Sequence, residues 1–303
     1  MEAVPGNPAA PTRLWRPFPH LLSCIRFDEV LILQGSPLLG ALFSMGRLTL
    51  ASAGALALLA AGSTCLVAHV FVLNDWSGMT ADLRDPNRTN EVFINRGVAR
   101  ARIGHLWMAL LALSLLLLGA VGWRSLTIAV MIAGLSALYS APASHIKGVP
   151  VLNSALHFAG GLLHFLLGYS IFRAPDGRGI EIGAFLALVF TAGHLTHETR
   201  DSESDTLNGI RTNAVRFGKR RNFIAGLVLF TLADVLLIAL ALRGIVPVSP
   251  LVVAALYFMH VYWSWQTMRA GLTFDSVRWL QVRYRFRYAA IGLMMVMTAM
   301  LAQ

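Results

Sequence analysis

The chain of 303 residues is strongly apolar: 56% of its residues are hydrophobic, 13% are charged, and its mean hydropathy is +0.63. This is more apolar surface than a soluble core of that size uses, so the composition argues against an ordinary soluble domain. The net charge of +10 could suggest a nucleic-acid partner, but the distribution of the basic residues argues against one. Cys24 and Cys65 support neither a disulfide framework nor a thiolate metal site.

Apolar stretches near the ~20 residues that a helix needs to cross a bilayer recur along the whole chain, separated by short polar segments. The sequence predicts an all-α, polytopic membrane protein with nine transmembrane helices, at residues 28–46, 49–74, 103–122, 125–141, 150–172, 180–199, 221–242, 248–268 and 283–302. The first range begins with two acidic residues and the fourth is short, so these depart most from an ideal span. One membrane domain, residues 28–303, follows an N-terminal tail, residues 1–27.

The basic residues lie mainly on one side of this predicted domain. Twenty of the 25 lysines and arginines fall in the tail and in the loops after the second, fourth, sixth and eighth spans. The positive-inside rule makes that side cytoplasmic, so we expect a cytoplasmic N-terminus and a C-terminus on the far side. Residues 1–20 are Pro-rich and polar and do not resemble a signal peptide. We expect an integral protein of a bacterial inner (plasma) membrane.

Acidic residues gather on this side against the basic trend. Eight of the 15 lie in two short segments, namely Asp75, Asp82, Asp85 and Glu91 after the second span, and Glu198, Asp201, Glu203 and Asp205 after the sixth. Residues 82–90 and 205–213 each hold an Asp followed six residues later by Arg-Thr-Asn. This pattern indicates an internal repeat. Four spans separate the copies, so both lie on one membrane face.

The spacing of the acids indicates a site for a hard cation. Asp201 and Asp205 are four residues apart, which places both carboxylates on one face of a helix. Like charges that close are unfavourable without a cation, and oxygen ligands of this kind suit Mg²⁺ shared with substrate phosphates. In the first copy Gly78 stands four residues before Asp82, where a matching acid is missing. Basic residues that could bind phosphate oxygens lie nearby: Arg88, Lys147, Arg211 and Arg216.

These segments resemble the motifs of the UbiA superfamily of intramembrane prenyltransferases. Residues 74–82, Asn-Asp-Trp-Ser-Gly-Met-Thr-Ala-Asp, are similar to its NDxxDxxxD motif, and residues 201–205, Asp-Ser-Glu-Ser-Asp, to its second motif, DxxxD. Residues 139–142, Tyr-Ser-Ala-Pro, with Lys147 are similar to a Tyr-Ser-x-Pro stretch after the fourth helix. The nine predicted spans resemble the family's helical plan over nearly the whole chain.

The resemblance implies a horseshoe of helices around a cavity that opens to lipid, with an isoprenyl diphosphate held through Mg²⁺ at its cytoplasmic end. It implies metal ligation by Asn74, Asp82, Asp201 and Asp205, with Asp75 and Asp85 as substitutes for the acid missing at Gly78. The implied catalytic residues are Asp82, Asp201 and Asp205, and the implied diphosphate-binding residues are Asn74, Arg88, Tyr139, Lys147 and Arg211. A Tyr-x-x-x-Lys arrangement found in some members is absent, because Ala143 follows Tyr139 by four residues.

The function that we predict is transfer of an isoprenyl group from a Mg²⁺-bound diphosphate to an aromatic or lipid acceptor. The partners would be the diphosphate, a hydrophobic acceptor and membrane lipid, with no nucleic acid. A UbiA-type terpene cyclase acting on the diphosphate alone stays open because of Gly78. A transporter is a weaker alternative, since transporter sites tend to lie near the bilayer midplane and these acids lie at one surface.

A few polar residues lie within the predicted spans. His157 and His164 share a face of the fifth span, and contacts with neighbouring helices explain them better than acceptor binding. His194 and His197 could chelate zinc from one helix, but no third ligand is apparent. Asp234, the one acid deep in a span, is either a structural hydrogen-bonding group or part of an acceptor site.

Overall fold

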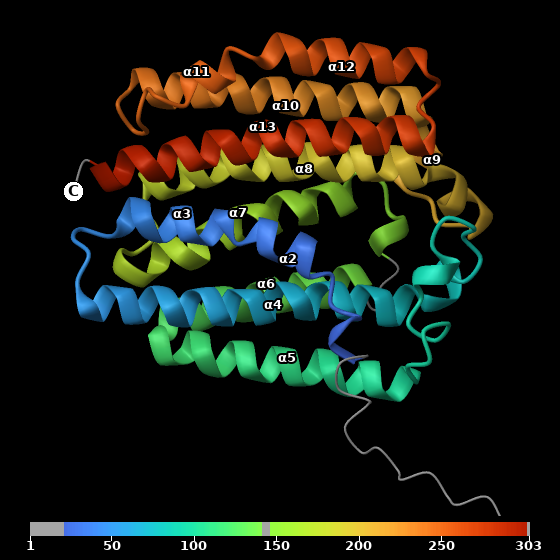
Figure 1. The fold of residues 1–303 in the computed structure, drawn as a ribbon, viewed down its shortest axis with the longest axis horizontal. Helices are drawn as coiled ribbons and strands as arrows, with labels where there is room; N and C mark the ends of the chain where they lie inside the picture. Colours follow the sequence, from blue (N-terminus) through green and yellow to red (C-terminus); the bar gives the residue numbers. More distant parts are fainter. Residues whose placement is uncertain (1–20, 141–145, 302–303) are drawn as a thin grey trace, which may run out of the picture.

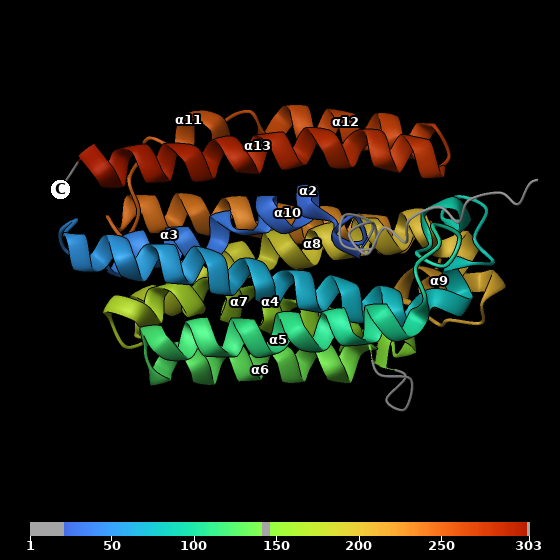
Figure 2. The same cartoon turned by 60° about the horizontal axis from the view of Figure 1, so that its bottom comes forward.

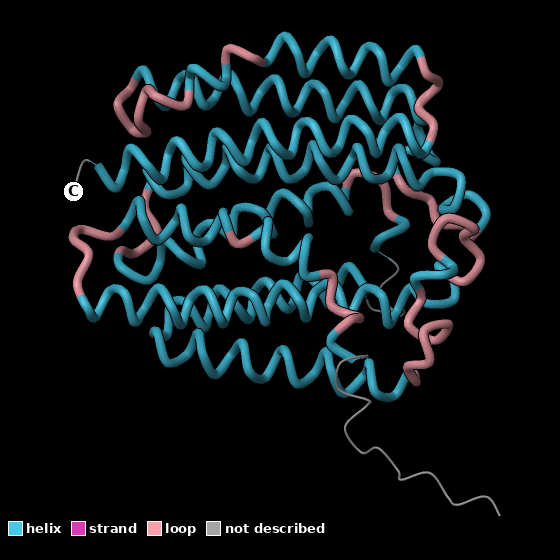
Figure 3. Tube along the Cα trace, viewed as in Figure 1, coloured by secondary structure: helices cyan, strands magenta, loops and turns pink. Residues whose placement is uncertain are grey.

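The computed structural model describes residues 21–140 and 146–301, and its regular elements there are all helices (Figure 3). The predicted tail up to residue 20 and Pro142 of the Tyr-Ser-x-Pro stretch lie outside the described residues. The elements are α2 Phe27–Leu33, α3 Gly35–Ser44, α4 Leu50–Asp82, η1 Thr89–Glu91, α5 Arg100–Val121, α6 Trp123–Ser140, η2 Ile146–Gly148, α7 Leu152–Phe172, α8 Gly177–Leu207, α9 Asn213–Phe217, α10 Lys219–Leu242, α11 Leu251–Ala254, α12 Tyr257–Arg269 and α13 Phe274–Leu301.

Six of the described helices, α4, α5, α6, α7, α8 and α10, are long and apolar enough to cross a membrane. They confirm the predicted class, an all-α polytopic membrane protein, although the count of nine spans is not confirmed. The predicted spans 28–46, 248–268 and 283–302 are not among the six.

These three spans differ from the others for local reasons. The first is divided at Gln34 into α2 and α3, and span 248–268 is interrupted between Ala254 and Tyr257. Helix α13 is continuous over its 28 residues, but its first half carries several charges, which lower its mean hydropathy: Asp275, Arg278, Arg283, Arg285 and Arg287.

The long helices run side by side along the longest axis of the molecule (Figure 1). Helix α4 packs on α5 and α6, while α8 packs on α7, α10 and α13. Helix α3 approaches α7 closely, since a Cβ atom added at Gly168 would lie 1.7 Å from the carbonyl oxygen of Pro37. Both views place α9 at the same end of the bundle as the segment that joins α4 to α5 (Figures 1 and 2). The two acidic segments are therefore brought to one end of the molecule.

A buried ion pair connects the last helices. Arg287 of α13 donates to Asp234 of α10 at 3.0 Å and to the carbonyl oxygen of Ala254 at 3.0 Å, where α11 ends. The hydroxyl of Tyr288 donates to the same carboxylate at 2.9 Å. Asp234 thus has a structural role, because its carboxylate joins α10 to α13 and to the break between α11 and α12.

Replacing Asp234 with Ala should destabilise the fold strongly, because it leaves the Arg287 guanidinium buried without its counter-ion. We expect a loss of about 3–5 kcal/mol, measured by unfolding in detergent. Arg243→Ala is the control, since Arg243 pairs with Glu181 on the exposed surface and should contribute less than about 1 kcal/mol. Similar, small losses in both variants would contradict the role given to the buried pair.

Candidate functional site

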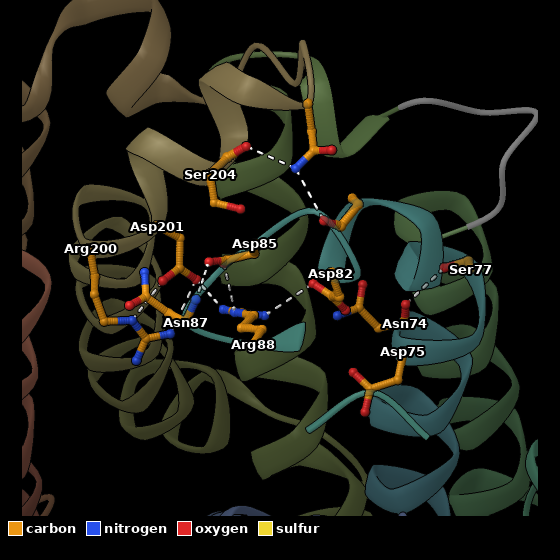
Figure 4. A network of polar contacts seen from close by, with 12 residues as sticks. Asn74, Asp75, Ser77, Asp82, Asp85, Asn87, Arg88, Arg200, Asp201 and Ser204 are labelled. Atoms are coloured by element: carbon orange, nitrogen blue, oxygen red, sulfur yellow. Dashed lines mark hydrogen bonds and ion pairs between the residues drawn. The ribbon is translucent and has the colours of Figure 1, made fainter. Parts of the chain in front are cut away.

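The first acidic segment reaches the site through the end of α4. Helix α4 continues eight residues past the predicted span and ends at Asp82, and Pro86 follows. The Asp85 carboxylate accepts the backbone N–H of Asn87 at 2.9 Å, and the carbonyl of Asp85 accepts the N–H of Arg88 at 3.1 Å. This turn directs Arg88 back towards the end of α4 (Figure 4).

The second acidic segment is the last part of α8, so Asp201 and Asp205 lie on a helix, as their spacing predicted. The helix ends in a Schellman turn: Gly209 has a φ of +67°, and the N–H of Ile210 donates to the carbonyl of Asp205 at 2.8 Å. The Asn208 side chain donates to the carbonyl of Ala81 at 3.2 Å. This hydrogen bond joins the ends of α8 and α4.

Arg88 lies between the two segments (Figure 4). Its guanidinium hydrogen-bonds to the carboxylate of Asp201. It also lies 3.7 Å from an oxygen of Asp82 and 3.7 Å from an oxygen of Asp85. One cation therefore contacts three carboxylates that come from both acidic segments. We call these four residues the carboxylate cluster.

Arg200 binds the other side of Asp201, with Nε 2.7 Å from Oδ1 and an Nη atom 3.1 Å from Oδ2. It also donates to the Oε1 atom of Gln281 on α13 at 2.9 Å. Neither contact could be predicted from the sequence, because adjacency of Arg200 and Asp201 in the chain does not show that their side chains meet. Arg200 thus neutralises Asp201 and ties it to α13.

The neighbouring carboxylates stabilise the positive charge of Arg88. Burial lowers the pKa of its guanidinium, but the attraction of Asp201, Asp82 and Asp85 outweighs burial, so that the pKa is raised. Arg88 is a permanent cation at the centre of the cluster.

Asp205 and Asp75, the other predicted acids of the site, have different partners. Asp205 is buried, accepts a hydrogen bond from the Thr212 hydroxyl at 3.2 Å and lies within electrostatic range of Lys147. Asp75 pairs instead with Arg26, whose Nε lies 3.2 Å from its carboxylate. Of the two proposed substitutes for the missing acid, Asp85 therefore joins the cluster and Asp75 does not.

The other predicted site residues surround the cluster. Asn74 is partly buried and lies two turns before Asp82 on α4, in the same group of side chains in Figure 4. Arg211 is exposed, and its backbone nitrogen lies beside Gly148, next to Lys147. The ring of Tyr139 contacts His157 edge-on, with ring centroids 4.9 Å apart.

The position of Gly78 is open towards the cluster. Apart from the backbone of its own helix, a Cβ atom added there would have one neighbour within 4 Å among the described residues, an Asp82 carboxylate oxygen at 3.7 Å. The acid missing from the first motif is therefore not excluded by packing.

The carboxylate oxygens of the cluster are ligands of the kind that a hard cation binds. Carboxylate oxygens of Asp82, Asp85 and Asp201 face one positive group, and such oxygens suit Mg²⁺. Within the described residues no three His, Cys, Asp or Glu side chains are arranged as a metal-binding group. The guanidinium of Arg88 lies among the three carboxylates.

The family is shown by the sequence itself. The model of the UbiA prenyltransferase family matches residues 36–297, so the chain belongs to this family. A comparison with curated proteins finds no match.

Solved structures share the fold at low sequence identity. A UbiA homologue from Archaeoglobus fulgidus, in a structure described as bound to DMAPP and Mg²⁺, is 17% identical with a TM-score of 0.67, covering 90% of this chain and 99% of that one. The apo UbiA homologue from Aeropyrum pernix K1 is 18% identical with a TM-score of 0.72 over 90% and 99%. A structure reported for digeranylgeranylglyceryl phosphate synthase is 16% identical with a TM-score of 0.69 over 93% and 98%.

Replacing Arg88 with Ala should lower the free energy of unfolding by about 2 kcal/mol, because three carboxylates lose the cation that they share. Added Mg²⁺ or Mn²⁺ should restore part of this loss, since a divalent ion can take the vacated position. The measurement is thermal unfolding in detergent with and without the metal. The exposed Arg84, replaced in the same way, is the control and should show neither effect. An Arg88 variant that does not respond to the metal would contradict this account of the cluster.

Proposed function

We propose that this protein is an intramembrane prenyltransferase that moves an isoprenyl group from a Mg²⁺-bound isoprenyl diphosphate to an aromatic or lipid acceptor. The observation that carries the proposal is the carboxylate cluster, which joins two acidic helix ends at one end of an apolar bundle. An apolar bundle suits a hydrocarbon tail, while charged groups at its end suit a diphosphate.

Asn74, Asp82, Asp201 and Asp205 are the proposed metal ligands, with Asp85 in place of the acid missing at Gly78. When bound, Mg²⁺ supplies a Lewis acid that offsets the charge on the departing diphosphate. Arg88 and Lys147 are the proposed diphosphate contacts, with Arg211 at the exposed rim and Tyr139 at the inner side. These side chains bind and orient the diphosphate, and the surrounding apolar helices exclude water from the reacting allylic carbon.

The names of the structural neighbours support this choice of substrate. Two structures of the Archaeoglobus fulgidus homologue are described as bound to DMAPP or GPP together with Mg²⁺. The synthase among the neighbours supports a lipid acceptor, whereas an aromatic acceptor rests on the family resemblance. We place the site on the cytoplasmic side of a bacterial inner membrane, because the basic residues gather there, with the C-terminus on the far side.

The test is diphosphate release by the detergent-solubilised protein given farnesyl or geranylgeranyl diphosphate and Mg²⁺. It is run with and without a panel of phenols, quinone precursors and glycerol phosphate ethers. Release that depends on an acceptor supports the transferase and identifies the acceptor class. Release without an acceptor, together with a cyclised hydrocarbon, supports a terpene cyclase. Absence of release under all these conditions contradicts both activities.

The variants Asp201→Ala and Asp205→Ala should each lower metal-dependent turnover at least ~100-fold, because each removes an oxygen ligand of the Mg²⁺ that offsets the charge on the departing diphosphate. Glu203→Ala is the matched control. Glu203 belongs to the same segment, but its carboxylate is exposed and pairs with Lys219 at 2.7 Å. Full turnover in both Asp variants would exclude the second acidic segment from the reaction.

The variant Gly78→Asp should bind Mg²⁺ more tightly, because it adds a carboxylate beside Asp82 in open space. Without metal the new charge should lower the melting temperature, since it lies near a like charge. Mg²⁺ should then raise the melting temperature by more than it does in the original protein. Ser77→Asp, one position earlier and turned away from the cluster in Figure 4, provides the comparison. An equal response to Mg²⁺ in both variants would show that residue 78 does not face the metal site.

A further inference from the structure

A second polar cluster lies between α6, α7 and α8. Its centre is Glu198, whose carboxylate accepts hydrogen bonds from Asn153 at 2.6 Å and from Asn213 at 2.9 Å. His194 lies one turn before Glu198 and stacks on His157, with ring centroids 3.5 Å apart and an interplanar angle of 11°. Tyr139, one of the predicted site residues, contacts the other ring of this pair edge-on. The cluster therefore adjoins the candidate site.

One face of α8 connects the two clusters. His194, Glu198, Asp201 and Asp205 are spaced by four, three and four residues, so they form a row along one side of the helix. Asp201 and Asp205 lie near the end of α8, and His194 lies about 10 Å further into the bundle than Asp201 at helical rise. A diphosphate held at the helix end would place its allylic carbon, and hence the acceptor, towards Glu198 and His194.

One nitrogen of the His194 ring lies beside the Glu198 carboxylate. In the described part of the chain no lysine or arginine forms an ion pair with this buried carboxylate; the ionisable group beside it is the imidazole of His194, whose Nε2 lies 3.4 Å from Oε1. That nitrogen is buried and makes no hydrogen bond of good geometry to a described residue. Nε2 therefore faces the Glu198 carboxylate, and Nδ1 is the ring nitrogen turned away from it.

Because the rings of His157 and His194 are stacked, only one of the two can act as a proton acceptor. The Nδ1 atom of His157 lies 2.8 Å from the carbonyl oxygen of Asn153 and must donate to it. Two stacked imidazolium rings would repel each other, so the pair can hold one extra proton and no more. His194 is the ring of the pair that lies beside a carboxylate, Glu198. Asn153 and Asn213 are positioning residues, since they fix the carboxylate.

We propose that His194, assisted by Glu198, accepts the proton that a hydroxylated acceptor loses when it is prenylated. The inference rests on the proposed function. The allylic C–O bond breaks and its electron pair leaves with diphosphate, while a pair from the acceptor's oxygen or activated ring carbon forms the bond to the allylic carbon. The proton released from the acceptor binds the lone pair of Nδ1, the ring nitrogen of His194 that does not face Glu198, and later passes to water. No oxidant or reductant is needed.

The test compares acceptors of different acidity. Transfer from geranylgeranyl diphosphate is measured with 4-methoxyphenol, 4-cyanophenol and 4-nitrophenol at pH 8, in the wild-type protein and in His194→Gln. General bases commonly contribute 10²–10⁴-fold, so we expect a loss of about 100-fold with 4-methoxyphenol. The loss should become small with 4-nitrophenol, because this phenol is already largely ionised. Binding of geranylgeranyl diphosphate with Mg²⁺ should be unchanged.

His164→Gln is the matched control. His164 lies on α7 and its Nε2 is 3.2 Å from the Ser63 hydroxyl, so its loss should not depend on the acidity of the acceptor. If His194→Gln fails to bind geranylgeranyl diphosphate, Glu198→Gln is measured instead. That variant should show the same dependence on acidity with a smaller loss, because His194 becomes a weaker base.

The outcomes separate this inference from the proposed function. Wild-type turnover of 4-methoxyphenol by His194→Gln would overturn the inference and leave the transferase intact. An equal loss with all three phenols would also overturn it, because a merely structural role predicts that result. A wild-type protein that binds geranylgeranyl diphosphate but prenylates no hydroxylated acceptor would contradict the proposed function and this inference together.

Discussion

The contact of Arg88 with Asp82, Asp85 and Asp201 is the interaction on which the site depends, because it resolves a conflict of charge. Two helix ends that carry carboxylates repel each other unless a cation lies between them. Arg88 supplies that cation from the chain itself, so the ends of α4 and α8 can stay adjacent without a metal. A guanidinium also suits phosphate oxygens, so in the proposed reaction Arg88 would serve both assembly of the site and diphosphate binding.

Helix α8 carries polar residues from the end of the bundle towards its interior. Its terminal turns present Asp201 and Asp205 at the end of the bundle, and its earlier turns present Glu198 and His194 towards the interior. Polar groups inside a membrane domain are costly unless they are paired, and the three carboxylates have hydrogen-bond partners: Arg88 and Arg200 for Asp201, Thr212 for Asp205, and two asparagines for Glu198. The His194 ring stacks on His157. The polar row is thus maintained by contacts from several elements.

Much of this arrangement could be predicted from the sequence, because it depends on spacing along the chain. The membrane class follows from apolar stretches, and the position of Asp201 and Asp205 on one helix face follows from their separation of four. The partners across helices could not be predicted. Asp75 and Asp85 looked equivalent as substitutes for the acid missing at Gly78, and tertiary contacts with Arg26 and Arg88 distinguish them. The role of Asn153 and Asn213 likewise appears only when three helices meet.

The two acidic segments hold their carboxylates on different kinds of structure. In the second segment both acids belong to α8, whose end is fixed by the Schellman turn. In the first segment the helix offers Asp82, and the next acid near Arg88 is Asp85, which lies beyond the helix in a turn that contains Pro86. Groups held on helices are positioned more accurately than groups on loops. We therefore expect the second segment to set the geometry of the site.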